Sequence, residues 1–166
     1  NTLRPYLLGD FLEMEFEEKE ILPFHIGKRD IAIIQAATNA GKTTLLRNVA
    51  LCMAAGRQFL PFYEGTRPIK LAYFDFENDA QDVQRDVRQM IEVFDDAEKK
   101  LLKQNFIVIP KGLMHGELFQ FNTHEKWANS LIQANDVEFI LVDNVSAAYD
   151  LNDENSNAEV TKKVIK

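Results

Sequence analysis

The residues of this chain that are best suited to chemistry are the eight from Ala36 to Thr43, with the sequence AATNAGKT. In a loop of this kind, backbone N–H groups of the loop and of the following helix point at one spot and carry partial positive charge, so an anion binds there. Lys42 can reach the β- and γ-phosphates of a nucleotide, and the hydroxyl of Thr43 can bind the Mg²⁺ that bridges them. The pattern predicts a phosphate-binding loop for a nucleotide.

This loop departs from the usual pattern at its first position, where Ala36 stands in place of the common glycine. Alanine is compatible with the loop if its φ is negative, and Gly41, which must approach the phosphates most closely, is present. The alternative is a chance Gly-Lys-Thr at a helix start, which the apolar run 31–34 before it and the amphipathic pattern after it disfavour. The residues expected to contact the phosphates are Ala37, Thr38, Asn39, Ala40, Gly41, Lys42, Thr43 and Thr44.

Asp143 is the candidate for a second contribution to the metal. It follows the continuous apolar run Phe139–Val142, which predicts a strand buried on both faces in the middle of a sheet. Ligands of open α/β sheets bind at the carboxyl ends of the strands, where Asp143 could hold Mg²⁺ through a water or through Thr43. The alternative is that Asp143 merely opens a turn with Asn144.

Hydrolysis of a nucleotide also needs a group that orients and deprotonates water beside the γ-phosphate. Asn144, directly after Asp143, is an amide and cannot accept a proton usefully. Glu77 is the candidate base, because it leaves the carboxyl end of another expected strand and so points to the same crevice. The alternative is a solvated acid in a strand-to-helix turn, ahead of a helix that Asp79 can cap.

Apolar runs and helical patterns alternate along the chain, which is typical of a parallel sheet covered by helices on both faces. The expected strands are 31–34, 69–76, 106–109 and 139–142, and the expected helices are 42–55, 80–94 and one that begins near residue 122. Before them, Leu12, Met14 and Phe16 alternate with glutamates, which indicates a half-buried edge strand or hairpin. We therefore expect a lead-in over residues 1–29 and an α/β core over residues 30–166.

The composition favours a cytoplasmic enzyme domain. The chain has 166 residues, 46% hydrophobic and 27% charged, which suits one compact domain. It contains neither a membrane-length apolar run nor an export signal, and its three histidines and Cys52 lack the spacing of a zinc site. The net charge of −7 argues against a generally basic nucleic-acid-binding surface, although it leaves room for a local basic loop.

Several segments together resemble the RecA-like P-loop ATPases of the RepA-type hexameric helicase family, which are AAA family ATPases. The resemblance rests on the order and spacing of separate segments from about residue 20 to the end of the chain. These segments are Ala36–Thr44, Phe59, Pro61–Phe62, Leu71–Asn78, Asp143–Asn144 and Asp153–Asn157.

The resemblance implies a RecA-like fold, hydrolysis of ATP with Mg²⁺, assembly into a homo-oligomeric ring, possibly a hexamer, and action on single-stranded DNA. It implies that Glu77 is the catalytic glutamate and that an arginine on the following helix takes part, for which Arg85 is the nearest match and Arg88 the alternative. Relatives continue past the helix expected near Ser156 with further strands, a sensor histidine and an arginine that reaches a neighbouring subunit. We therefore expect this chain to lack the last strands of the fold.

A motor that hydrolyses ATP is the activity that the resemblance implies. The alternatives are an ATP-dependent switch or clamp with little turnover, and a small-molecule kinase built on the same loop. A kinase would need an acceptor pocket with an arginine-rich lid, and we find no such segment in the sequence.

Overall fold

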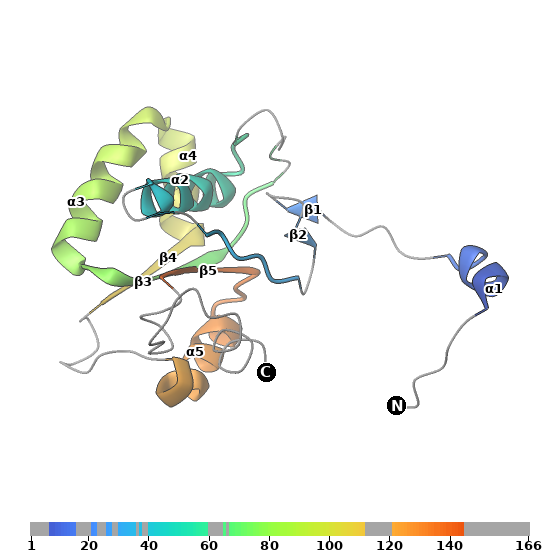
Figure 1. Ribbon diagram of the computed structural model, residues 1–166. Helices are drawn as coiled ribbons and strands as arrows, with labels where there is room; N and C mark the ends of the chain where they lie inside the picture. The colour runs from blue at the N-terminus through green and yellow to red at the C-terminus, as the bar shows by residue number, and fades with distance from the viewer. Residues whose placement is uncertain are drawn as a thin grey trace.

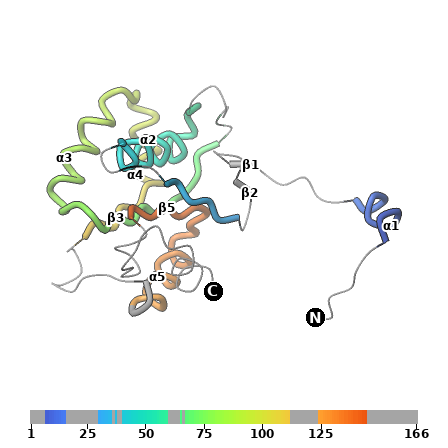
Figure 2. Tube along the Cα trace, viewed as in Figure 1, coloured from blue at the N-terminus to red at the C-terminus, as the bar shows by residue number. Residues whose placement is uncertain are grey.

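The computed structural model describes residues 7–15, 21–22, 26–27, 30–35, 37, 40–59, 65, 67–111 and 121–144. Figures 1 and 2 show the elements, in chain order α1 (Leu8–Leu12), β1 (Ile21–Leu22), β2 (Ile26–Gly27), α2 (Lys42–Ala55), β3 (Leu71–Asp79), α3 (Ala80–Met90), the 3-10 helix η2 (Ile91–Val93), α4 (Asp96–Asn105), β4 (Phe106–Lys111), α5 (Phe121–Ala134) and β5 (Phe139–Asp143). Among these helices, none is both long enough and apolar enough to cross a bilayer.

Strands β3, β4 and β5 form one parallel sheet in the order β4-β3-β5. Leu71 of β3 is aligned with Phe106 of β4 and with Phe139 of β5, and the register with β5 continues until Asp75 lies opposite Asp143. Helices α2, α3 and α4 lie on one side of this sheet and α5 lies on the other (Figure 1). The predicted class, an α/β fold with a parallel sheet and helices on both faces, is confirmed.

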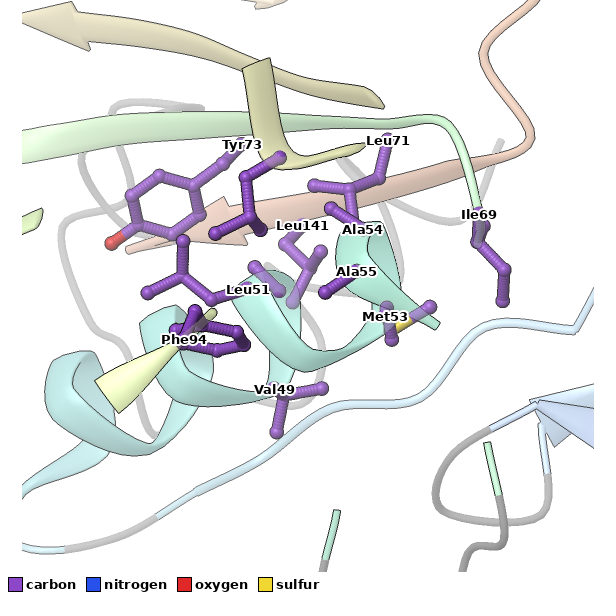
Figure 3. Packing of buried hydrophobic residues seen from close by; sticks show 12 residues of the cluster. Val49, Leu51, Met53, Ala54, Ala55, Ile69, Leu71, Tyr73, Phe94 and Leu141 are labelled. Atoms are coloured by element: carbon purple, nitrogen blue, oxygen red, sulfur yellow. The ribbon is translucent and has the colours of Figure 1, made fainter. Parts of the chain in front are cut away.

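The side chains of β3 alternate between two hydrophobic cores, one on each face of the sheet. Leu71 and Tyr73 belong to the core shared with α2 and α4, whereas Phe74 belongs to the core shared with α5. The first six residues of β3 are all buried, as expected for a strand at the centre of a parallel sheet. Figure 3 shows Leu51 and Ala54 of α2 among the side chains that fill the space between this helix and the sheet.

Helix α2 lies between two glycines that adopt the left-handed conformation, in which a Cβ atom is strained. Gly41 precedes the helix with φ 83°, and Gly56 follows it with φ 71°. The N–H of Gly56 donates to the carbonyl of Met53 at 3.1 Å and so closes the last turn. The predicted helix 42–55 is confirmed at both ends.

The long helix predicted over 80–94 is in fact shorter and is followed by a separate helix, α4, that the sequence analysis missed. Asp79 precedes α3 as expected, but its side chain makes no capping hydrogen bond. A capping box starts α4: the Asp95 side chain accepts from the N–H of Glu98 at 2.8 Å, and the Glu98 side chain accepts from the N–H of Asp95 at 2.9 Å. Buried Phe94 separates the two helices and joins the core, which explains why the apolar period continued past the end of α3.

The predicted strand 31–34 is wrong for the structure as described. Residues 30–35 have no regular structure, and Ile31, Ile33 and Ile34 are 68%, 55% and 38% exposed. Consequently β5 is an edge of the described sheet rather than its middle, and Ile140 is 41% exposed. An apolar run of four residues is compatible with a buried strand. It is too short to show the hydrophobic period of a strand, and it does not identify a neighbouring strand with which to pair.

The alternation that began at Leu12 also does not form a strand where the structure describes it. Leu12 ends the short helix α1, and residues 13–15 after it are exposed and irregular, while Phe16 lies outside the described residues. An antiparallel pair, β1 with β2, follows at 21–22 and 26–27. An alternation of six residues is too short to decide between a strand and the end of a helix.

We predict that Gly56→Ala lowers the free energy of unfolding by at least about 1–2 kcal/mol, because alanine is strained at positive φ. A Cβ atom there would also lie 2.7 Å from the backbone nitrogen of Pro68. Urea unfolding followed by circular dichroism measures the change. Gly9→Ala is the matched control, since a Cβ atom at Gly9 meets nothing within 4 Å. Equal stability of the two variants would contradict the prediction.

Candidate nucleotide site

The described part of the predicted phosphate loop leads directly into α2. Ala36, Thr38 and Asn39 lie outside the described residues. The N–H of Ala40 donates to the carbonyl of Ala37 at 3.2 Å, and Gly41 then turns the chain with its positive φ. A Cβ atom at Gly41 would meet no atom within 4 Å, so there is space for a side chain. Glycine is favoured at this position because of the positive φ.

The start of α2 has the electrostatic character that an anion requires. Lys42 and Thr43 are partly exposed in the first turn, and Thr44 is exposed. The first turn carries no acidic side chain, and no side chain caps the helix. The partial positive charge of this helix end is therefore not neutralised by the first turn itself, which fits the binding of a phosphate there.

Two buried carboxylates lie side by side at the carboxyl ends of neighbouring parallel strands. Asp75 of β3 and Asp143 of β5 are aligned in the sheet, and they are 1% and 3% exposed. The hydroxyl of Tyr73 lies 3.0 Å from Oδ2 of Asp143 and 3.3 Å from Oδ2 of Asp75, and it can donate its single proton to one of them at a time. This pair brings two carboxyl groups together at the ends of the paired parts of β3 and β5.

Arg47 of α2 reaches into this pair of carboxylates and is itself only 3% exposed. Its Nη2 donates to Oδ2 of Asp75 at 2.8 Å, its Nη1 to Oδ2 of Asp86 on α3 at 2.7 Å, and its Nε to the hydroxyl of Tyr73 at 3.3 Å. One guanidinium thus joins α2, β3 and α3. We call Arg47, Tyr73, Asp75, Asp86 and Asp143 the Arg47 cluster.

The protonation states of the Arg47 cluster follow from burial and charge together. Burial acts to lower the pKa of Arg47, but hydrogen bonds and charges from Asp75 and Tyr73 outweigh it, so this pKa lies above its ordinary value. Burial, and then the negative charges of Asp143 and Asp75, raise the pKa of Tyr73 well above its ordinary value. The tyrosine therefore keeps its proton at neutral pH and remains a hydrogen-bond donor.

The Arg47 cluster connects the phosphate loop with Asp143. Thr43 and Arg47 are four residues apart in α2, so they share one face of the helix. The guanidinium of Arg47 contacts the hydroxyl of Tyr73, which donates to Asp143. Arg47, one helical turn after Thr43, is therefore linked to Asp143 through Tyr73, and a shared Mg²⁺ site of Thr43 and Asp143 stays a prediction.

Asp143 and Thr43 also have the chemistry that Mg²⁺ requires when it binds with a nucleotide. In the part of the chain that the structure describes, no group of three or more His, Cys, Asp or Glu side chains could hold a metal ion alone. Mg²⁺ bound with nucleotides usually takes one or two carboxylates and completes its shell with phosphate oxygens and water. One buried carboxylate and one hydroxyl fit that requirement.

Glu77 lies just beyond Asp75, where the ladder between β3 and β4 is interrupted. The Oδ1 atom of Asp75 accepts from the N–H of Glu77 at 3.1 Å and from the N–H of Asn78 at 2.8 Å, so the buried carboxylate binds the backbone of this irregular part of β3. The Glu77 residue itself is exposed. An exposed carboxylate at the carboxyl end of the central strand is suitably placed for a base, and this role stays a prediction.

Arg85 lies on the surface of α3 rather than in the Arg47 cluster. Its side chain is 70% exposed and forms ion pairs with Asp82 at 2.7 Å and with Asp86 at 3.4 Å. Since Asp86 also binds Arg47, the two arginines share one carboxylate. Arg88, the alternative, is exposed in the last turn of the same helix.

The sequence analysis missed Arg47, Tyr73, Asp75 and Asp86, which make most of the polar contacts of the site. A signal for Arg47 was present, because it is the one charged residue of α2 after Lys42 and lies among apolar residues. Asp75 interrupts the apolar face of β3 in a similar way. Their partners are 26 to 39 residues away in the chain, so local patterns could not show the contacts.

Comparison with known families identifies the family of the chain. The family model described as an AAA domain matches residues 3–166. The match covers nearly the whole chain, which therefore belongs to the AAA domain family, within the P-loop ATPases that bind nucleotides. The comparisons with curated proteins and with solved structures give no match.

We predict that Arg47→Met lowers the free energy of unfolding by about 3–5 kcal/mol, because it leaves buried Asp75 without its counter-ion. Chemical unfolding of the two proteins measures the difference. The matched control is Arg67→Met, which removes the ion pair of Arg67 with Glu138, where both side chains are at least 40% exposed. That control should cost no more than about 1 kcal/mol. Similar losses of unfolding free energy in both variants would show that the burial of the Arg47–Asp75 ion pair does not determine its contribution to stability.

Proposed function

We propose that this chain binds ATP with Mg²⁺ and hydrolyses it as the RecA-like ATPase part of a RepA-type hexameric helicase. The observation that carries the proposal is the Arg47 cluster, in which Asp143 and Asp75 at the carboxyl ends of parallel strands are linked to the helix that follows the phosphate loop. Membership of the AAA domain family supports the nucleotide-binding part of the proposal.

In this proposal the triphosphate lies at the N-terminus of α2. The loop supplies backbone N–H groups, and Lys42 supplies a positive charge for the β- and γ-phosphates. The proposed phosphate contacts are Ala37, Thr38, Asn39, Ala40, Gly41, Lys42, Thr43 and Thr44. The lack of an acidic residue in the first turn of α2 supports this placement, since nothing there repels an anion.

Thr43 and Asp143 are the proposed residues for Mg²⁺. When bound, the ion would neutralise charge that develops on the phosphate oxygens during transfer. Asp143 would hold the ion indirectly, through a water or through Thr43, and Thr43 would contribute its hydroxyl. Asp75 is paired with Arg47, whereas buried Asp143 has only the neutral donor Tyr73, so its negative charge favours a cation at this edge of the sheet.

Glu77 is the proposed general base that orients and deprotonates the attacking water. Its exposure and its place at the end of the central strand support this role, and the amide of Asn144 cannot replace it. Arg85 is the proposed arginine that stabilises charge on the phosphates. Its ion pairs with Asp82 and Asp86 are near the surface, so the guanidinium can exchange partners at little cost.

The oligomeric and DNA-binding parts of the role rest on the resemblance alone. They comprise a homo-oligomeric ring, possibly hexameric, that acts on single-stranded DNA. The composition and residue patterns support a cytoplasmic protein with residues 1–29 as a lead-in and residues 30–166 as the ATPase core. The net charge of −7 means that any contact with DNA must come from a local surface rather than from the overall field.

We predict that Lys42→Ala weakens ATP binding by roughly 10- to 100-fold, because a hydrogen bond to a charged group contributes about 1.5–3 kcal/mol. Titration with a fluorescent ATP analogue measures the affinity. Lys103→Ala is the matched control, since Lys103 is exposed in the last turn of α4. Unchanged ATP affinity of the Lys42→Ala variant would contradict the assignment of the phosphate site to this loop.

We predict that Glu77→Gln keeps ATP binding but lowers hydrolysis by roughly 10²- to 10⁴-fold, because the amide cannot accept the proton of water. Phosphate release with and without single-stranded DNA measures turnover, with Glu92→Gln as a control at an exposed acid of η2. Normal turnover in Glu77→Gln would contradict the assignment of the base. Tight binding by the unsubstituted protein without turnover would favour a switch, and phosphate appearing on a metabolite would favour a kinase.

A further inference from the structure

Tyr73 has an unusual position for a tyrosine, because its hydroxyl is buried between two carboxylates and a guanidinium. The residue is 0% exposed, and its ring stacks on Phe106 with the ring centroids 6.1 Å apart. A ring held in this way cannot move its hydroxyl far. The hydroxyl therefore offers a hydrogen bond from one fixed point.

The neighbours of the hydroxyl direct its proton toward Asp143. Nε of Arg47 donates to the hydroxyl oxygen at 3.3 Å, so the hydroxyl acts as an acceptor on that side. Oδ2 of Asp75 already accepts from Nη2 of Arg47 at 2.8 Å, and it lies farther from the hydroxyl than Oδ2 of Asp143 does. The hydrogen bond from the Tyr73 hydroxyl therefore stabilises Asp143 more than Asp75, since Asp143 makes no ion pair with Arg47.

The hydrogen bond also fixes how the Asp143 carboxylate is presented. Tyr73 is its hydrogen-bond donor within the described part of the chain, and it binds Oδ2. A hydrogen bond to Oδ2 restricts the rotation of the carboxylate. It thereby also determines where the second oxygen, Oδ1, points. Outer-shell hydrogen bonds of this type orient metal ligands and tune their affinity.

We propose that Tyr73 is a positioning residue for Asp143 and that its hydroxyl sets how tightly the site takes Mg²⁺ with ATP. This inference rests on the proposed function, because it assumes that Asp143 faces the metal of a bound nucleotide. Tyr73 is fully buried, so it acts through Asp143 and does not itself contact the ligand. The binding of ATP without metal should therefore be independent of the hydroxyl.

Tyr73→Phe tests the proposal, because it removes the hydroxyl and keeps the ring that packs on Phe106. The 166-residue chain is titrated with a fluorescent ATP analogue, first in EDTA and then at increasing Mg²⁺. We expect the Mg²⁺ concentration for half-maximal enhancement of binding to rise by about 10-fold or more, with affinity in EDTA unchanged. Mn²⁺ titration followed by electron paramagnetic resonance in the presence of ATP measures the bound metal directly.

The matched control is Ser130→Ala, which also removes one hydroxyl, on α5 at the other side of the sheet, where it donates to the carbonyl of Lys126 at 2.8 Å. It should leave the Mg²⁺ dependence unchanged. If Tyr73→Phe unfolds, site-specific 3,5-difluorotyrosine at position 73 replaces it. This residue keeps the hydroxyl and makes it a stronger donor, so a changed Mg²⁺ dependence with unchanged affinity in EDTA supports the proposal.

An unchanged Mg²⁺ dependence in the folded Tyr73 variant would overturn the inference, and so would an equal loss of affinity with and without Mg²⁺. These results differ from failure of the proposed function, in which the unsubstituted chain itself binds no ATP at any Mg²⁺ concentration. In that case the inference fails with the function on which it rests.

Discussion

Burial of the Arg47 guanidinium is the constraint on which the rest of the site depends. Removing a charged group from water costs several kcal/mol, and only well-placed acceptors can repay it. Arg47 finds them in Asp75, Asp86 and the hydroxyl of Tyr73, which belong to the central strand and to the helix that follows it. Any shift of α2 against β3 or α3 would break at least one of these hydrogen bonds. Helix α2, which follows the predicted phosphate loop, is therefore fixed in position relative to β3 and α3.

The charge of the Arg47 cluster is a second constraint, and it points toward a cation. The cluster contains one guanidinium and three carboxylates, so it has a net charge of −2 when all of them are ionised. Asp86 is partly exposed and water can stabilise it, whereas Asp75 and Asp143 are buried. Arg47 pairs with Asp75, which leaves Asp143 with a neutral donor, Tyr73. A carboxylate in this situation is stabilised by any positive charge that comes close.

Much of the fold could be predicted from the sequence, because buried parallel strands read as apolar runs and α2 is bounded by clear signals. The runs that became β3, β4 and β5 were recognised for this reason, and Gly56 marked the end of α2. The run 31–34 has the same signature and is no strand in the described structure, since composition does not select a partner. The capping box at Asp95 was visible in the sequence, but the apolar period running on to Phe94 hid the break before α4.

The site could be predicted only in part, for a physical reason that the two arginines illustrate. Lys42, Thr43 and Glu77 belong to local patterns, whereas the role of Arg47 depends on partners that only the fold brings near. Arg85 is 70% exposed, and surface ion pairs contribute about 0–1 kcal/mol, so its side chain can leave Asp82 and Asp86 at little cost, as the proposed role requires. Arg47 cannot do this, because leaving would strand a buried carboxylate. The buried side chain of Arg47 therefore has a structural role in the site. The exposed side chain of Arg85 is accessible to a ligand, which is consistent with its proposed role.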